Sequence, residues 1–524
     1  MFSIHSSAIY GICAIAVSVE TDVSAGIPQF TIVGLPDASV RESRERIRAA
    51  IKNSGLAFPR GRVTVNLAPA HLRKQGALYD LPIAISLIAQ TGIFDATLLA
   101  HTVILGELGL EGDVRSVRGI LPTALMTKQQ DGFVLIVPKE NAAEAMIVDG
   151  LTVYAVSTLR ELIDHLRGEN PLSPEFPSSQ LPTQSEQICF SQIHGQAFAK
   201  RGLEIAAAGG HHVLLQGPPG TGKTMLARAL SSILPALTHE EAIEVANIRS
   251  VCGLNIHQTT IMFERPFRSP HHSCSGASLI GGGSIPTPGE ISLAHRGVLF
   301  LDELPEFAPR VLEHLRQPLE DGCVTIARSA GTIRFPSQFQ LIATRNPCPC
   351  GYLNDPKRAC VCSQGKIDLY QKRLSGPLFD RLDLVIEVPN IQMKDLSQET
   401  LIETSAHVRK RVVNARQMQT ERFKETGIFL NQEMSAALLK KHIRLTKEAR
   451  DLLDHAFSEG MLSTRGYFRL QKSARTIADF SNASDVEEEH IAEALMFRVD
   501  NRATTQEIAS KNTRRSGLPS RSHQ

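Results

Sequence analysis

GPPGTGKT, residues 217–224, fits the G-x-x-x-x-G-K-[ST] pattern of a phosphate-binding loop. It lies between the apolar run HHVLLQ and the helical pattern KTMLARALSSIL, so it joins a predicted strand to the start of a predicted helix. Glycines let backbone N–H groups surround phosphate oxygens, and the helix N-terminus adds partial positive charge. The predicted ATP-binding residues are Gly217, Pro218, Pro219, Gly220, Thr221, Gly222, Lys223 and Thr224.

A second motif, GVLFLDE at residues 297–303, predicts the hydrolytic half of the site. Four apolar residues of a core strand end in two carboxylates. We expect Asp302 and Thr224 to hold Mg²⁺, Lys223 to reach the β and γ phosphates, and Glu303 to deprotonate the attacking water. An apolar run followed by Asp-Glu is also typical of a plain strand end. Its position about 80 residues after the phosphate loop favours the catalytic interpretation.

These motifs, with FQLIATRNPCPCG and LSGPLFDRLDL, resemble AAA+ ATPases of the magnesium-chelatase-like branch. The chain is similar to the ComM/YifB family over nearly its whole length. The resemblance implies that Asn346 is the first sensor, Arg381 an arginine finger reaching a neighbouring subunit, and Arg465 the second sensor. A finger acting on a neighbour implies a ring, here a homohexamer. From the residues alone, a capping role for Asn346 and an ion pair of Arg381 with Asp380 or Asp383 stay open.

The length of 524 residues exceeds one ordinary core, and a Pro- and Ser-rich stretch at 168–186 is the best linker candidate. The expected fold is α/β and multidomain: a Lon-peptidase-like α/β domain, an AAA+ P-loop core with a parallel sheet, and an all-α lid. The expected boundaries are 1–167 for the Lon-like domain, 168–187 for the linker, 188–392 for the core with a cysteine insertion at 346–362, 393–502 for the helical lid, and 503–524 for a disordered basic tail.

The first domain resembles a Lon-type peptidase in residues 76–85 and 103–141, but the catalytic pair of that fold is missing. A Ser nucleophile and a Lys base are required. The alignment places Ile83 and Leu121 at those positions, and neither side chain attacks a carbonyl or accepts a proton. If the alignment slips, Ser86 and Lys128 are the alternative pair. We therefore predict a scaffold or a nucleic-acid platform without proteolytic activity.

Four of the nine cysteines fall in NPCPCGYLNDPKRACVC, residues 346–362. Cys348, Cys350, Cys360 and Cys362 form a C-x-C, nine-residue, C-x-C pattern that predicts one tetrahedral zinc per chain, with Zn–S bonds of about 2.3 Å. Reversible disulfides and free thiols are the alternatives. The remaining five cysteines are scattered singly, which favours a reducing compartment.

Basic side chains predict contacts with DNA at two loops. Residues 323–335 alternate β-forming residues around a Ser-Ala-Gly turn, which predicts a hairpin, and the resemblance places it in the pore of the ring. Arg328 and Arg334 would then contact backbone phosphates. Lys357 and Arg358 lie at the tip of the cysteine loop. The sequence shows no base-reading motif, which is consistent with binding that ignores DNA sequence.

The resemblance implies an ATP-driven homohexameric helicase that moves DNA branches during homologous recombination in natural transformation. Expected partners are single-stranded and branched DNA, recombinase-coated DNA intermediates and other copies of the chain, with ATP, Mg²⁺ and zinc as cofactors. The N-terminus lacks the basic region of a signal peptide, so we expect a cytoplasmic protein without a membrane partner. Three alternatives are a chelatase-type motor that remodels a protein for metal insertion, an ATP-dependent peptidase and a nucleotide-gated DNA scaffold.

Overall fold

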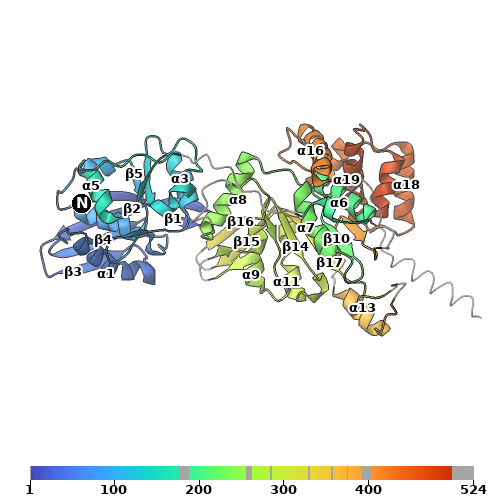
Figure 1. Ribbon diagram of the computed structural model, residues 1–524, viewed down its shortest axis with the longest axis horizontal. Coiled ribbons are helices and arrows are strands. Elements are labelled where there is room, and N and C mark those ends of the chain that lie inside the picture. Colours follow the sequence, from blue (N-terminus) through green and yellow to red (C-terminus); the bar gives the residue numbers. More distant parts are fainter. Residues whose placement is uncertain are drawn as a thin grey trace, which may run out of the picture.

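A computed structural model describes most of the chain as three units that follow one another along its long axis (Figure 1). The predicted tail, Lys357 and most of the predicted linker lie outside the described residues. The described residues are 2–176, 188–254, 262–283, 286–328, 331–353, 355, 358–373, 376–391 and 403–498.

The N-terminal unit, residues 2–166, is built on a seven-stranded mixed sheet of order β3-β4-β2-β1-β5-β8-β9. The long hairpin of β1 and β2 alternates in burial, because one face of it packs on the buried helix α2. Its helices and strands are β1 (Phe2–Tyr10), β2 (Cys13–Ser24), β3 (Gln29–Val33), α1 (Ala38–Asn53), β4 (Arg62–Ala68), α2 (Asp80–Ala89), β5 (Thr102–Ile104), β6 (Glu107–Leu108), β7 (Val114–Arg115), α3 (Ile120–Lys128), β8 (Val134–Pro138), α4 (Ala142–Ala145), β9 (Thr152–Val156) and α5 (Leu159–Leu166).

The central unit, residues 188–391, has a five-stranded sheet of order β11-β14-β17-β10-β18 in which every pairing is parallel. Strands β14 and β17 are buried at every residue, which explains the continuous apolar sequence of β14 and the apolar centre of β17. Its elements are α6 (Ala197–Gly209), β10 (Val213–Gln216), α7 (Lys223–Ile233), α8 (His239–Val251), β11 (Phe267–Arg268), α9 (Gly276–Ile280), β12 (Gly281–Gly282), β13 (Thr287–Pro288), α10 (Glu290–Leu293), β14 (Val298–Leu301), α11 (Pro309–Glu313), α12 (Arg316–Asp321), β15 (Cys323–Arg328), β16 (Gly331–Pro336), β17 (Gln340–Arg345), α13 (Gln364–Lys372), α14 (Gly376–Phe379) and β18 (Leu384–Glu387).

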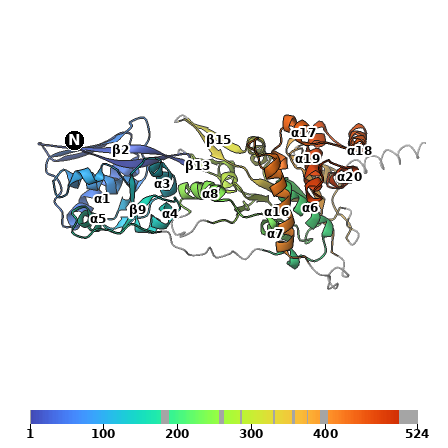
Figure 2. The ribbon, with the colours of Figure 1, turned by 90° about the horizontal axis from the view of Figure 1, so that it is seen from above.

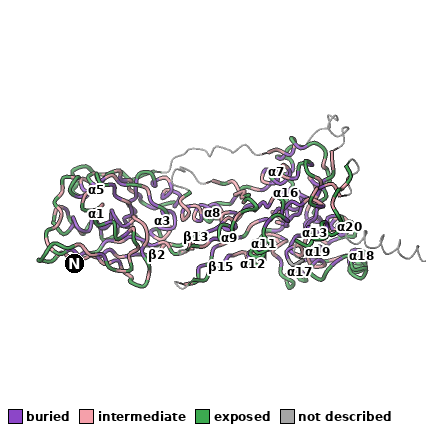
Figure 3. The backbone as a smooth tube through the Cα atoms, turned by 90° about the horizontal axis from the view of Figure 1, so that it is seen from below, coloured by how far each residue is buried: buried purple, intermediate pink, exposed green. Residues whose placement is uncertain are grey.

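The C-terminal unit, residues 403–498, is helical and shares one hydrophobic core with α6, α7, β10 and β18 of the central unit. Figure 3 shows buried residues in both α16 and α19, the helices that face the central unit. Its helices are α16 (Ser405–Arg422), α17 (Ala436–His442), α18 (Lys447–Ser458), α19 (Thr464–Phe480) and α20 (Glu488–Met496).

The N-terminal unit contacts the central unit through α8 and the hairpin of β15 and β16 (Figure 2). The backbone N–H of Gly119 donates to the carbonyl of Ser250 over 3.2 Å, so the start of α3 meets the last turn of α8 end to end. Asn247, also on α8, donates to the carbonyl of Ile12 in the β1–β2 turn. A Cβ on Gly331 would lie 2.5 Å from the hydroxyl of Tyr10, so the hairpin tip fits closely against the same turn.

Candidate active site

The phosphate-binding loop leaves β10 and enters α7, as the sequence predicts. Gly217 has no room for a side chain, because a Cβ there would lie 2.2 Å from the carbonyl oxygen of Val388. The buried Nζ of Lys223 donates to the carbonyls of Gly217 and Pro218, both at 2.7 Å, and to Oδ1 of Asn346 at 3.0 Å. Burial lowers the pKa of Lys223, and the nearby Asp302 and Glu303 oppose that shift.

The two carboxylates follow β14, which is separated from β10 only by β17. The hydroxyl of Thr224 donates to Oδ2 of Asp302 over 3.2 Å, so the first turn of α7 and the end of β14 meet. Hydroxyl and carboxylate oxygens are ligands that Mg²⁺ prefers, and the pair fits a magnesium ion held together with phosphate oxygens. Glu303 is exposed and adopts left-handed backbone angles, φ 53° and ψ 54°. A residue other than glycine rarely adopts these backbone angles, because they are strained. Such strained residues often occur at functional sites.

Sequence reasoning missed Thr344, which connects both acidic residues. Its hydroxyl donates to Oδ1 of Asp302 at 2.6 Å and accepts from the backbone N–H of Glu303 at 2.8 Å. Thr344 is fully buried in β17, two residues before Asn346. The alternation of side chains along a strand places residues 344 and 346 on the same side, and this signal was available in the sequence.

The structure brings together Lys223, Thr224, Asp302, Glu303 and Asn346, all at the carboxyl ends of three neighbouring parallel strands. Such an edge is where open parallel sheets bind their ligands. This group supplies a cation for phosphate oxygens, an oxygen pair for a metal, an exposed carboxylate and an amide.

Arg381 and Arg465 come from other parts of the chain, the segment before β18 and the start of α19. Arg381 is buried, and its guanidinium pairs with Glu320 at the end of α12, not with Asp380 or Asp383. Arg465 is exposed in the first turn of α19.

Arg469, one helical turn after Arg465, makes the contact between the lid helix and the segment that carries Arg381. It donates to the carbonyl of Arg381 over 2.6 Å and to Oδ1 of Asp383 over 2.5 Å. Sequence reasoning did not single out Arg469, because its acceptors are a backbone carbonyl and a carboxylate distant in sequence.

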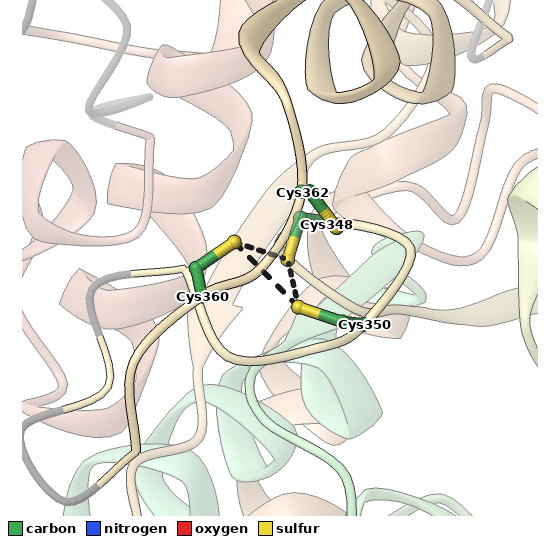
Figure 4. A group of neighbouring side chains, drawn as sticks. All are labelled: Cys348, Cys350, Cys360 and Cys362. Atoms are coloured by element: carbon green, nitrogen blue, oxygen red, sulfur yellow. Dashed lines mark hydrogen bonds between the residues drawn. The ribbon is translucent and has the colours of Figure 1, made fainter.

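The four cysteines at 348–362 converge to one point (Figure 4). The sulfur of Cys348 lies 3.4 Å from that of Cys350 and 3.6 Å from that of Cys360, and Cys350 and Cys360 are 3.5 Å apart. All four sulfurs fall within 4.8 Å of one another, and the cysteines are not joined by disulfides. A tetrahedral zinc site with Zn–S bonds of about 2.3 Å has S–S edges of about 3.8 Å, so the four thiols fit zinc.

The predicted hairpin is confirmed, with β15 and β16 antiparallel and Thr325 opposite Arg334. Arg328 and Arg334 are exposed. Arg358 is exposed as well and lies over the ring of Tyr352, 4.3 Å from its centre. These three cations are therefore accessible to an anionic partner.

The positions that the sequence alignment assigns to a Lon-type pair hold buried apolar side chains, Ile83 in α2 and Leu121 in α3. The alternative pair is separated: the hydroxyl of Ser86 bonds with that of Thr21 at 2.7 Å, and Lys128 donates to the carbonyl of Gly150 at 2.8 Å. Neither pair forms the nucleophile and base of a peptidase.

None of the helices in the described parts of the chain combines the length and apolar character that crossing a bilayer requires.

Comparison with known families covers all three units. Residues 19–141 match "Subunit ChlI of Mg-chelatase", residues 189–396 match "Magnesium chelatase, subunit ChlI", and residues 402–498 match its C-terminal family. The magnesium-chelatase 38 kDa subunit of Cereibacter sphaeroides is 25% identical over 60% of the chain and 91% of its own length.

Several relatives match over almost their whole length. YifB of Escherichia coli is 41% identical over 95% of the chain and 97% of its own length. Competence protein ComM of Haemophilus influenzae is 42% identical over 94% of the chain and 97% of its own length. This chain belongs to the ComM/YifB family of magnesium-chelatase-like AAA+ ATPases.

Proposed function

We propose that the protein hydrolyses ATP and uses the energy to move along DNA as a homohexameric ring. The observation that carries the hydrolytic part is the meeting of Lys223, Thr224, Asp302, Glu303 and Asn346 at one edge of the central sheet. Phosphoryl transfer to water needs little more than positioned charge and an oriented nucleophile, and this group provides both.

Each residue has a proposed task. When ATP binds, the ammonium group of Lys223 leaves the loop carbonyls and binds oxygens of the β and γ phosphates. The loop residues 217–224 bind the phosphates through their N–H groups. Thr224 and Asp302 hold Mg²⁺, which neutralises charge on those oxygens when bound. Asn346 orients the attacking water, and Glu303, kept in place by Thr344, accepts its proton.

Arg381 and Arg465 complete the proposed site from other positions. Arg381 leaves its ion pair with Glu320 and binds the γ-phosphate of the ATP held by a neighbouring subunit. This contact between subunits requires a ring. Arg465 acts from the exposed start of α19 as the second sensor. An arginine finger, the role proposed for Arg381, raises the rate of hydrolysis by about 10³- to 10⁵-fold.

The DNA part of the proposal rests on exposed cations and on the relative named competence protein ComM. Arg328 and Arg334 on the hairpin and Arg358 on the cysteine loop, with Lys357 beside it, would contact phosphates of single-stranded or branched DNA. We place the action in the cytoplasm, in branch migration during recombination of incoming DNA, where recombinase-coated intermediates are the substrate. A chelatase-type motor is the second candidate, because the magnesium-chelatase subunit matches over 60% of the chain.

The N-terminal unit is proposed to be a Lon-like domain without peptidase activity, with domain limits of 1–167, 188–392 and 393–502 around the linker 168–187. Its contacts with α8 and the hairpin support a scaffold role. Zinc in the cysteine cluster belongs to the same proposal, because four converging thiolates satisfy its coordination.

The test is a branch-migration assay on synthetic three- and four-way DNA junctions with the full-length protein, ATP and Mg²⁺. We expect DNA-stimulated phosphate release and strand exchange by the wild type, and neither by Glu303→Gln. Arg334→Ala should keep DNA-independent ATPase activity and lose stimulation by DNA, with the exposed Arg310→Ala as a matched control. A wild type that hydrolyses ATP without any response to DNA would contradict the DNA motor and favour the chelatase-type alternative.

A further inference from the structure

The cysteine cluster begins two residues after Asn346 and packs directly on the phosphate-binding loop. Cys348 is fully buried, and the backbone N–H of Gly351 donates to its carbonyl over 2.9 Å, which closes a tight turn. Two of the four thiols, those of Cys348 and Cys350, therefore sit on a turn that continues the strand β17 and its proposed sensor.

Gly351 is the point of contact with the phosphate-binding loop. It is buried, has a left-handed φ of 84°, and a Cβ there would lie 2.5 Å from Cδ and 3.0 Å from Cγ of Pro219. Pro219 is the third residue of the loop 217–224. The turn and the loop thus touch without space for a methyl group, so a displacement of one requires a displacement of the other.

The other two thiols, those of Cys360 and Cys362, belong to a segment that buries few apolar side chains. Val361, between Cys360 and Cys362, is 88% exposed, and Arg358 and Ala359 are exposed too. The cluster brings this segment within 3.6 Å, sulfur to sulfur, of the turn at Cys348. Closing a loop without a core costs chain entropy, and a metal bound by thiolates from both ends offsets that cost.

The cysteine loop also has a contact with the segment that follows β18. Asn390 donates to Oδ2 of Asp355 over 2.8 Å, while Oδ1 of Asp355 accepts from the N–H of Arg358. The segment that precedes Asn390 contains Val388, whose carbonyl lies against Gly217. The cysteine loop is therefore linked to the phosphate-binding loop directly through Gly351 and indirectly through the segment that carries Val388 and Asn390.

We propose that metal occupancy of the four-cysteine site sets the conformation of the phosphate-binding loop, and hence the affinity for nucleoside triphosphate. Zinc bound by Cys348, Cys350, Cys360 and Cys362 fixes the Gly351 turn against Pro219 and holds the loop open for phosphates. Loss of zinc releases the turn and the loop with it. Gly351 is a positioning residue in this arrangement. The inference rests on the proposed zinc and ATP sites and adds a coupling between them.

The test measures zinc content and nucleotide affinity on the full-length protein without DNA. Elemental analysis should find about one zinc per chain in the wild type and none in Cys360→Ser, while the exposed-cysteine control Cys13→Ser keeps its zinc. Binding of a fluorescent ATP analogue should weaken about tenfold in Cys360→Ser, the size of effect typical when support behind a binding residue is lost. Cys13→Ser should bind like the wild type.

Two further measurements separate coupling from misfolding. Gly351→Ala should keep its zinc and lose affinity by a similar factor, because the new methyl group collides with Pro219. Wild type stripped with a mercurial and a chelator should lose affinity and regain it when zinc is added back. An absence of zinc from the wild type, or stripped protein that binds the analogue unchanged, would overturn the coupling while leaving the ATPase proposal intact. Zinc-loaded wild type that binds no nucleotide would overturn both.

Discussion

Polar residues lie at both ends of the central sheet, but their burial and their bonding partners differ. At the carboxyl ends of the strands, Glu303 is exposed, and Lys223 contacts carbonyls of its own loop. At the amino ends of β10 and β18, His211, His212 and Asp383 are buried.

The polar groups at the amino ends bond to one another and to the C-terminal unit. The N–H of His212 donates to Oδ2 of Asp383 over 2.8 Å, and the ring of His211 bonds with the hydroxyl of Thr476 over 2.8 Å. Arg469 of the lid binds the other oxygen of Asp383. One edge thus keeps contacts that a ligand can replace, and the opposite edge uses its polar groups to fix the lid. Substitutions at the first edge should change activity, and those at the second should change stability.

The largest effect should come from Glu303→Gln at the carboxyl-end edge. Glutamine cannot accept the proton of the attacking water, so we expect ATP hydrolysis to fall by about 10²- to 10⁴-fold. Steady-state phosphate release, nucleotide affinity and the melting temperature should be measured together. Glu306→Gln is the matched control. Glu306 lies three residues after Glu303 and is an exposed acid that pairs with Arg373. A Glu303→Gln protein that hydrolyses ATP normally, or that melts early, would contradict the contrast between the edges.

Asp383→Asn at the amino-end edge should have the largest effect on stability. It leaves Arg469 without a charged partner in a buried network, which costs about 3 kcal/mol or more. Differential scanning calorimetry should show an earlier transition for the shared core of the central and C-terminal units. Asp451→Asn, on the exposed face of α18, should leave the transition unchanged. Equal melting of the two variants would argue against a structural role for this edge.

Thr344→Val tests whether the carboxyl-end edge depends on a buried contact. Valine keeps the shape but removes the hydroxyl that joins Asp302 to the N–H of Glu303. We expect hydrolysis to fall by about 10- to 100-fold, with a smaller loss of nucleotide affinity. Single-turnover hydrolysis and equilibrium binding separate the two effects. The control is Thr325→Val on the exposed face of the hairpin, and identical rates for both variants would rule out the positioning role.

The smallest effect should be a pH dependence of the lid contact. Burial lowers the pKa of His211 and of His212 to about 4, whereas an unfolded histidine titrates near pH 6.5. Below pH 6.5 the unfolded chain takes up protons that the folded protein excludes. The stabilisation is therefore complete above pH 6.5 and lost progressively as the pH falls towards 4. Melting temperatures at pH 7.5, 6 and 5 should decline, and less steeply in His211→Gln.

Three of the residues that meet at the carboxyl ends of the central strands were predicted from motifs: Lys223 from the phosphate-binding loop, and Asp302 and Glu303 from the end of an apolar run. Asn346 was singled out only by the family resemblance. The structure places the four close together because the carboxyl ends of neighbouring parallel strands share one edge of the sheet. Contacts between side chains distant in sequence could not be found by the same reasoning. The pairing of Arg381 with Glu320 joins the end of α12 to the loop before β18, and no local pattern encodes that distance.

The remaining gaps have the same physical origin. The approach of Gly351 to Pro219 depends on how two loops pack, and a glycine in a cysteine-rich turn has an ordinary local explanation. The spacing of the cysteines, by contrast, did predict that they converge, because a shared ligand constrains all four positions at once.

The contact between α3 and α8 couples the N-terminal and central units. The backbone N–H groups of Gly119 and Leu121, at the start of α3, both bond to Ser250 in the last turn of α8. Ala246, one turn earlier in α8, is buried in the hydrophobic core of the N-terminal unit. We therefore expect a displacement of α8 to move the N-terminal unit with it.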